Sequence, residues 1–180
     1  LYAVTGDILH KKGEEQEAFA AYDSCLQWKD DNVMALNNYA YYLSEKGVDL
    51  HKAEAMSYKT IKAEPNNGTY LDTYAWILFM EERYADAKTY IDQALKNRDS
   101  TADNSTVLEH AGDIYYINGM ADESVDFWKK AYTGENQTEV LAWKIKNRQY
   151  ITGEELKKRN APKQKPAATK KSVRKGKKNK

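Results

Sequence analysis

Residues 71–78 read LDTYAWIL, and three related stretches occur elsewhere in the chain: YAVTGDIL at 2–9, LNNYAYYL at 36–43 and LEHAGDIY at 108–115. Each stretch has one small residue at the same place, and successive small residues are 34, 35 and 37 positions apart. A repeat with a period between about 20 and 50 residues is typical of stacked supersecondary units. The repeat therefore decides the fold class. The four small residues are Gly6, Ala40, Ala75 and Gly112.

Each repeat continues with a turn and a second small residue. Gly13, Gly47 and Gly119 mark the turn in three repeats, and residues 82–83 occupy it in the third repeat along the chain. The apolar spacing on either side predicts two helices of about 12–16 residues. A small residue at a helix crossing lets two backbones approach closely, which explains a glycine inside a helix despite its cost of about 1 kcal/mol. The second small residues are Ala18, Ala53, Ala87 and Ser124.

This pattern resembles the tetratricopeptide repeat, whose 34-residue unit reads W-x2-L-G-x2-Y, then A-x3-F, then P. The resemblance covers residues 1–133, and the second repeat ends at Pro65 as the family pattern requires. One extra residue stands within 48–51, and three more stand within 97–106, where the terminal proline is missing. The third repeat matches the pattern at Leu71, Tyr74, Ala75, Leu78, Ala87 and Ile91.

The resemblance implies an all-α fold, an α-α superhelix of four helix-turn-helix repeats at residues 1–31, 32–67, 68–102 and 103–135. Residues 139–151 predict a further helix, with Leu141 and Ile145 on an apolar side and Lys144 elsewhere. Solenoids need a helix that is apolar on one face and polar on the other to cover their last repeat. We therefore assign residues 136–152 to a capping helix.

The charge of the chain is divided unevenly. Its 180 residues contain 28 Lys and Arg against 27 Asp and Glu, but 12 of the basic residues and none of the acidic ones lie within 157–180. Residues 1–156 therefore hold 16 basic and 27 acidic residues, a net charge of −11. The basic end has two prolines, no aromatic residue and little to bury, so residues 153–180 are predicted to form a disordered tail.

A second stripe of each first helix is the candidate binding site. It is displaced by about one residue, or ~100° around the helix, from the stripe that packs on neighbouring helices. The resemblance implies that this second stripe lines the concave surface on which tetratricopeptide domains bind peptides. The predicted peptide-binding groove consists of Asp7, Asn37, Tyr41, Asp72, Trp76, Phe79, Glu109, Asp113 and Tyr116.

This set combines aromatic rings with carboxylates. The combination suits a protein or peptide segment rich in Lys or Arg, through cation–π and charge-assisted contacts. Tyr41 and Tyr116 are equally compatible with packing against adjacent helices, whereas Trp76 and Phe79 are more compatible with facing the groove. Both interpretations stay open at this stage.

One subclass of the family clamps the C-terminal carboxylate of a chaperone with Lys, Arg and Asn. An acidic groove would repel that carboxylate, so we reject this subclass. Asn37 and Asn38 are present, but the positions where cations would be needed hold Ala3, Asp7, Thr69 and Thr73.

No catalytic, metal or cofactor site is predicted. His10, His51 and His110 fall in different repeats without paired metal-ligand spacing. The single cysteine, Cys25, stands in a second helix, where a buried inert thiol is expected. The G-x-x-x-x-G-K-[ST] phosphate loop does not occur in the sequence. The sequence therefore favours a non-enzymatic interaction scaffold that has no small-molecule substrate.

The basic tail supports an alternative function. A cluster of Lys and Arg can tether the repeat body to an anionic membrane or to nucleic acid. Because the body and the tail carry opposite charges, the tail can also fold back on the groove as a lid. In both versions the tail, rather than the groove, faces the partner or controls access to it.

The sequences LNNYAYYLSEKG (36–47) and TYLDTYAWILF (69–79) resemble those of bacterial, Bacteroidetes-like tetratricopeptide repeat proteins. Many such proteins are anchored in the cell envelope, so the resemblance favours a periplasm-facing location. The chain begins at Leu1 with the repeat pattern already under way. We therefore expect it to be the C-terminal part of a longer protein.

Overall fold

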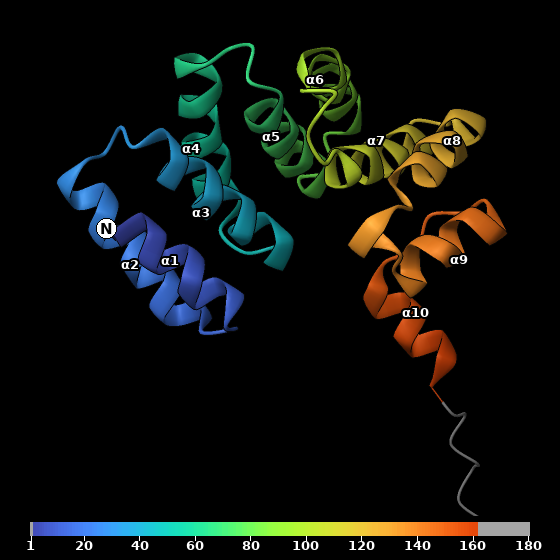
Figure 1. The fold of residues 1–180 in the computed structure, drawn as a ribbon, viewed down its shortest axis with the longest axis horizontal. Helices are drawn as coiled ribbons and strands as arrows, with labels where there is room; N and C mark the ends of the chain where they lie inside the picture. Colours follow the sequence, from blue (N-terminus) through green and yellow to red (C-terminus); the bar gives the residue numbers. More distant parts are fainter. Residues whose placement is uncertain (1, 162–180) are drawn as a thin grey trace, which may run out of the picture.

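The computed structural model describes residues 2–161, and every regular element in this range is a helix. The helices follow one another in pairs along an arch, with α1 and α2 at one end and α9 and α10 at the other (Figure 1). No helix among these residues is long and apolar enough to cross a bilayer. The helices are α1 (Tyr2–Lys11), α2 (Glu15–Trp28), α3 (Val33–Lys46), α4 (Leu50–Ala63), α5 (Gly68–Met80), α6 (Tyr84–Asn97), α7 (Ser105–Ile117), α8 (Ala121–Ala131), α9 (Glu139–Asn147) and α10 (Gly153–Asn160), with a short 3-10 helix η1 (Gly134–Asn136) before α9.

The predicted superhelix of helix-turn-helix repeats is confirmed. The first eight helices form four pairs, and the first helices α3, α5 and α7 lie on the inner side of the arch (Figure 1). The starts of α3 and α5 are fixed by asparagine caps: Asn32 Oδ1 accepts the Ala35 N–H at 3.1 Å, and Asn67 Oδ1 accepts the Thr69 N–H at 3.0 Å. Such caps satisfy backbone donors that have no partner within the helix.

The small residues predicted at the helix crossings are all buried. The second helix of each pair has one side chain four residues after its small residue, and in the first and fourth pairs this side chain lies at the crossing. These four side chains differ in size but are fully buried, and they are Tyr22, Ser57, Ile91 and Trp128. Rings occur where the first helix has glycine: a Cβ added at Gly6 would lie 2.7 Å from the Tyr22 ring, and one added at Gly112 would overlap Trp128.

The turn inside each pair uses a left-handed backbone conformation at the predicted place. Gly13, Gly47 and Gly119 have φ of 80°, 65° and 83°, and Glu82 takes the equivalent place in the third pair with φ of 63°. Glycine adopts this conformation without the steric penalty of a Cβ. The third pair therefore has the same turn without a glycine.

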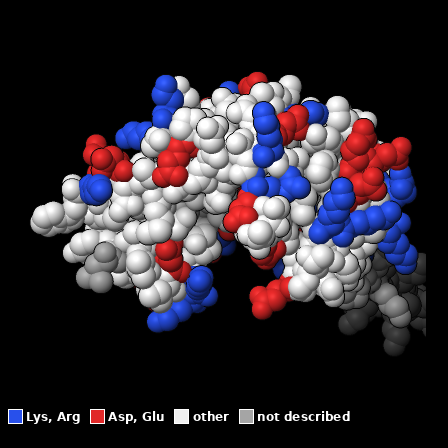
Figure 2. Space-filling view, turned by 45° about the horizontal axis from the view of Figure 1, so that its top comes forward, with Lys and Arg blue, Asp and Glu red and all other residues white. Residues whose placement is uncertain are grey.

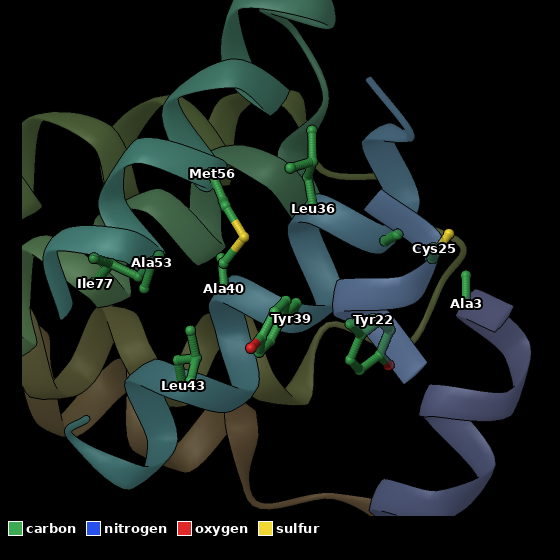
Figure 3. Packing of buried hydrophobic residues seen from close by; sticks show 11 residues of the cluster. Ala3, Tyr22, Cys25, Leu36, Tyr39, Ala40, Leu43, Ala53, Met56 and Ile77 are labelled. Atoms are coloured by element: carbon green, nitrogen blue, oxygen red, sulfur yellow. The ribbon is translucent and has the colours of Figure 1, made fainter. Parts of the chain in front are cut away.

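The core is a row of clusters that follows the arch. The first cluster joins the first two helix pairs, where the rings of Tyr22 and Tyr39 lie 5.3 Å apart and nearly parallel (Figure 3). Met56 from α4 and Ile77 from α5 belong to the same cluster, which therefore reaches the third pair. Each pair is thus stabilised by its neighbours, as in other solenoids.

The end of the fold differs from the prediction, because residues 153–160 form α10 rather than part of a disordered tail. Thr152 and Glu155 form a reciprocal capping box at its start. Leu156 is buried, and the Arg159 guanidinium lies 5.2 Å from the Trp143 ring of α9. The rest of the predicted basic tail, residues 162–180, lies outside the described residues, together with the tether and lid hypotheses that depend on it.

Replacing Gly112 by Ala tests the close helix crossing. The added methyl must displace the Trp128 indole, and such overpacking costs about 1–3 kcal/mol even though alanine favours the helix. Urea unfolding should show a reduced free energy of unfolding. Gly153→Ala is the matched control, since its Cβ would meet Val140 at an ordinary 3.6 Å and should cost nothing. Equal stability of both variants would contradict this packing.

Candidate functional site

Two adjoining pockets occupy the inner side of the arch. They have volumes of about 530 Å³ and about 540 Å³, and Tyr41 and Thr106 line both of them. The space-filling view shows the molecule hollowed between the two arms of the arch, with charged groups of both signs near the rim (Figure 2). Because they share a wall, the two pockets form one continuous surface, which we call the inner groove.

The first pocket lies where α3, α5 and α7 begin, and most of the residues that line it are polar. Asn37 is 5% exposed, and its Oδ1 has no hydrogen-bond partner among the described residues. Its Nδ2 donates to Asn38 Oδ1 at 3.2 Å. The other amide side chains of this pocket come from the segments before α5 and α7 and from the end of α6, namely Asn66, Asn67, Asn104 and Asn97.

The second pocket has an aromatic floor. Trp76 stacks on His110 with ring centroids 4.1 Å apart, and on its other side it stacks on Phe79 at 5.0 Å. Tyr41 extends this row, since its ring lies 6.0 Å from His110. Beyond Phe79 the row continues through Tyr150. The indole Nε1 of Trp76 is buried and has no hydrogen-bond partner among the described residues.

A buried histidine joins α5 and α7 under this floor. His110 Nδ1 lies 2.9 Å from Asp72 Oδ1 and 3.1 Å from Oδ2. Burial alone would lower the pKa of His110, but the neighbouring Asp72 carboxylate outweighs it, so the pKa is raised. Asp72 was predicted as an acidic residue of the groove, and the structure places it in this pair.

Lys144 brings a cation into the inner groove from α9. Its Nζ donates to both oxygens of Asp113 at 2.7 and 2.8 Å, and to Glu109 Oε1 at 3.2 Å. Burial raises the pKa of Asp113, and the Lys144 ammonium opposes this shift. The prediction that Lys144 lies away from the packed face of its helix was wrong. It follows Leu141 by three residues, so both residues share the buried face.

The inner groove contains six of the nine predicted residues. Asp7 lies outside it, where it accepts hydrogen bonds from the Tyr22 hydroxyl and from Asn38 Nδ2. Phe79 and Tyr116 line neither pocket, although Phe79 supports the aromatic floor. Those in the pocket walls are Asn37, Tyr41, Asp72, Trp76, Glu109 and Asp113.

Sequence reasoning missed three groups of this surface: His110, Lys144 and Tyr150. Tyr150 follows α9 and lies in the second pocket, where burial raises the pKa of its hydroxyl. His110 stands next to the predicted Glu109 on the same helix. The predicted stripe therefore should have included one more residue of this helix. Lys144 and Tyr150 lie outside the repeats, and no repeat position points to them.

Replacing Lys144 by Ala should destabilise the fold strongly, because it leaves Asp113 buried without its cation. Removing one partner of a buried ion pair typically costs about 3–5 kcal/mol. The measurement is urea unfolding, with Lys146→Ala on the exposed side of α9 as control. The double change Asp113→Asn with Lys144→Met should recover part of the loss, because neither charge then remains. A Lys144→Ala variant as stable as Lys146→Ala would exclude this role.

The His110–Asp72 pair should make stability depend on pH. A raised pKa in the folded state means that the contribution of His110 is complete below about pH 6.5, the pKa of an unfolded histidine, and is lost as pH rises through the folded pKa. The free energy of unfolding of the native chain, minus that of His110→Gln, should therefore fall across this range. Asp72→Asn, which removes the carboxylate that raises the pKa, should abolish the same trend. Parallel profiles for the native chain and His110→Gln would contradict it.

Comparison with known proteins supports the repeat fold. No family model matches the chain. A curated TPR repeat-containing protein of Pseudomonas aeruginosa is 35% identical over 66 residues, which are 37% of this chain and 11% of that protein. This chain therefore spans only a small part of that relative.

Solved structures resemble a larger part of the chain. PilF of Pseudomonas aeruginosa has a TM-score of 0.68 at 16% identity, covering 82% of this chain and 65% of that one. A tetratricopeptide repeat protein of Parabacteroides merdae has a TM-score of 0.62 at 19% identity, covering 82% and 56%.

A third solved structure, YrrB, is described as a TPR protein with an unusual peptide-binding site. Its TM-score is 0.56 at 18% identity, with 82% of this chain and 74% of that one covered. At such identities the likeness shows the fold alone. Together with the four repeated helix pairs and the match in sequence, it shows that this chain has the fold of a tetratricopeptide repeat solenoid.

Proposed function

We propose that the chain is a non-enzymatic interaction scaffold that holds an extended segment of another protein in its inner groove. The observation that carries this proposal is the pair of adjoining pockets along α3, α5 and α7, with an aromatic floor and unpaired polar atoms. The description of YrrB as a peptide-binding protein of the same fold supports it. Concave surfaces built by stacked repeats commonly serve as extended binding surfaces.

The charge of the groove favours a segment that contains Lys or Arg. The first pocket has the carboxylates of Asp72, Asp99 and Asp103 against the single cation Arg98. The first pocket therefore has a net charge of −2 among the described residues. The second has three carboxylates against Lys144 and His110, a net charge of −2 with His110 neutral and −1 with His110 protonated. The three carboxylates of the second pocket belong to Glu45, Glu109 and Asp113.

The exposed Glu45 and the half-buried Trp76 are the groups that we assign to such a ligand. Glu45 stands at the wall of the second pocket and can accept a charge-assisted hydrogen bond from Lys or Arg. Tyr41 offers a ring face to the aliphatic stem or the cation of that side chain. Trp76, whose two faces stack on His110 and Phe79, offers its exposed edge as apolar surface.

The experiment selects short peptides on the immobilised chain from a random display library, and measures the selected peptides by calorimetric titration at low and high salt. Basic peptides should dominate. Trp76→Ala should weaken binding at least roughly tenfold, as expected for a central aromatic anchor. Glu45→Gln should weaken it less and reduce its dependence on salt, because one exposed charge is removed.

Two matched controls distinguish the groove from the rest of the surface. Trp28→Ala removes a tryptophan that is 84% exposed at the end of α2, and Glu123→Gln removes an exposed carboxylate of α8. Neither should change the affinity. Binding that survives Trp76→Ala in a folded protein would refute the groove assignment, and selected peptides without an excess of Lys or Arg would refute the assigned ligand class.

A further inference from the structure

A second cluster of functional groups lies outside the inner groove, at the junction of the second and third helix pairs. His51 and Glu54 stand one turn apart at the start of α4, and Glu81 stands at the end of α5. One ligand atom from each residue lies within 4.8 Å of the other two. None of the three lines either pocket of the inner groove, so this cluster is independent of the proposed function.

Glu81 is the unusual member of this cluster. Its side chain is only 9% exposed, and its Oε1 is buried without a hydrogen-bond partner among the described residues. A buried carboxylate oxygen that lacks a partner is costly, so such an atom points to a missing ligand. Oε1 faces the cluster, since it lies 3.5 Å from His51 Nδ1.

Arg83 holds the two carboxylates in place without using this atom. Its Nη1 lies 2.7 Å from Glu54 Oε1 and 3.4 Å from Glu81 Oε2. The Tyr74 hydroxyl also donates to Glu54 Oε1, at 3.3 Å, which leaves Oε2 as the oxygen of Glu54 to assign to a ligand. Partners of this kind orient metal ligands from the outer shell.

The charged residues in and around the cluster have an excess of two negative charges. Glu54, Glu81 and Asp86 are acidic, and Arg83, which also pairs with Asp86 at 3.1 Å, is the cation among them. With His51 neutral, the group has a net charge of −2. A bound divalent cation would neutralise it.

We propose that His51 Nδ1, Glu81 Oε1 and Glu54 Oε2 form a binding site for a divalent transition metal of the Zn²⁺ class. One imidazole nitrogen with carboxylate oxygens is a donor set that Zn²⁺ accepts, whereas Mg²⁺ and Ca²⁺ prefer oxygen ligands alone. Ligands about 2.1 Å from a tetrahedral Zn²⁺ are separated by about 3.4 Å. The observed 3.5 Å between His51 Nδ1 and Glu81 Oε1 matches this spacing.

The metal would join two repeats. His51 and Glu54 belong to the second helix pair and Glu81 to the third, so an ion bound by all three crosses the interface between α4 and α5. A ligand that binds only the folded chain stabilises it by mass action. Zn²⁺ should therefore raise the thermal midpoint of unfolding, and Mg²⁺ at the same concentration should not.

The test titrates ZnCl2 into the full chain after treatment with a chelator, by calorimetry. One Zn²⁺ should bind per chain. Loss of an outer-shell partner alone costs roughly 10–100-fold in metal affinity, so removal of a ligand by His51→Ala or Glu81→Gln should weaken binding about tenfold or more. The His51 side chain is fully exposed, so His51→Ala should leave the fold intact.

His10→Asn and Glu82→Gln are the matched controls. His10 lies on α1, far along the chain from the cluster, and Glu82 is an exposed carboxylate directly beside Glu81. Both variants should bind Zn²⁺ as the native chain does. Absence of stoichiometric binding, or an affinity that His51→Ala leaves unchanged, would overturn the proposal.

Discussion

The close crossing of the two helices in each repeat is the constraint on which the rest of this structure depends. Where the first helix has glycine, the second helix fills the crossing with a ring: Gly6 faces Tyr22, and Gly112 faces Trp128. Where the first helix has Ala40 or Ala75, the corresponding side chain is Ser57 or Ile91. Interiors are close-packed, so a larger residue on one helix requires a smaller one on the other.

The size of the residue that the second helix places at the crossing also determines which residue of the first helix faces the inner groove. The residue after each glycine is an aspartate that accepts a hydrogen bond from the buried ring: Asp7 from the Tyr22 hydroxyl, and Asp113 from Trp128 Nε1 at 2.9 Å. A buried hydroxyl or indole N–H needs such a partner. In the two middle repeats the second helix has Ser57 or Ile91 instead of a ring, so no acceptor is needed at the position after the small residue. That position holds Tyr41 or Trp76, whose rings line the groove.

The repeat pattern was sufficient to predict the fold, because the small residues and turn glycines recur at fixed spacing. It also predicted a stripe that contributes Tyr41, Trp76 and Glu109 to the groove. The pattern could not predict which carboxylates are already paired. Lys144 lies outside the repeats, and the His110–Asp72 pair joins residues 38 positions apart. Such contacts depend on the curvature of the stack, which the sequence of a single repeat does not specify.

The pairing inside the groove changes how a basic segment would be held. Lys144 and His110 already compensate Asp113 and Asp72, so the desolvation cost of these buried carboxylates is met within the fold. A ligand cation therefore gains little from them directly. It meets the net negative charge that remains in the groove, the exposed Glu45, the ring face of Tyr41 and the exposed edge of Trp76. Contacts of this kind act near water, where charges are screened, so the aromatic floor should contribute more of the affinity than the carboxylates.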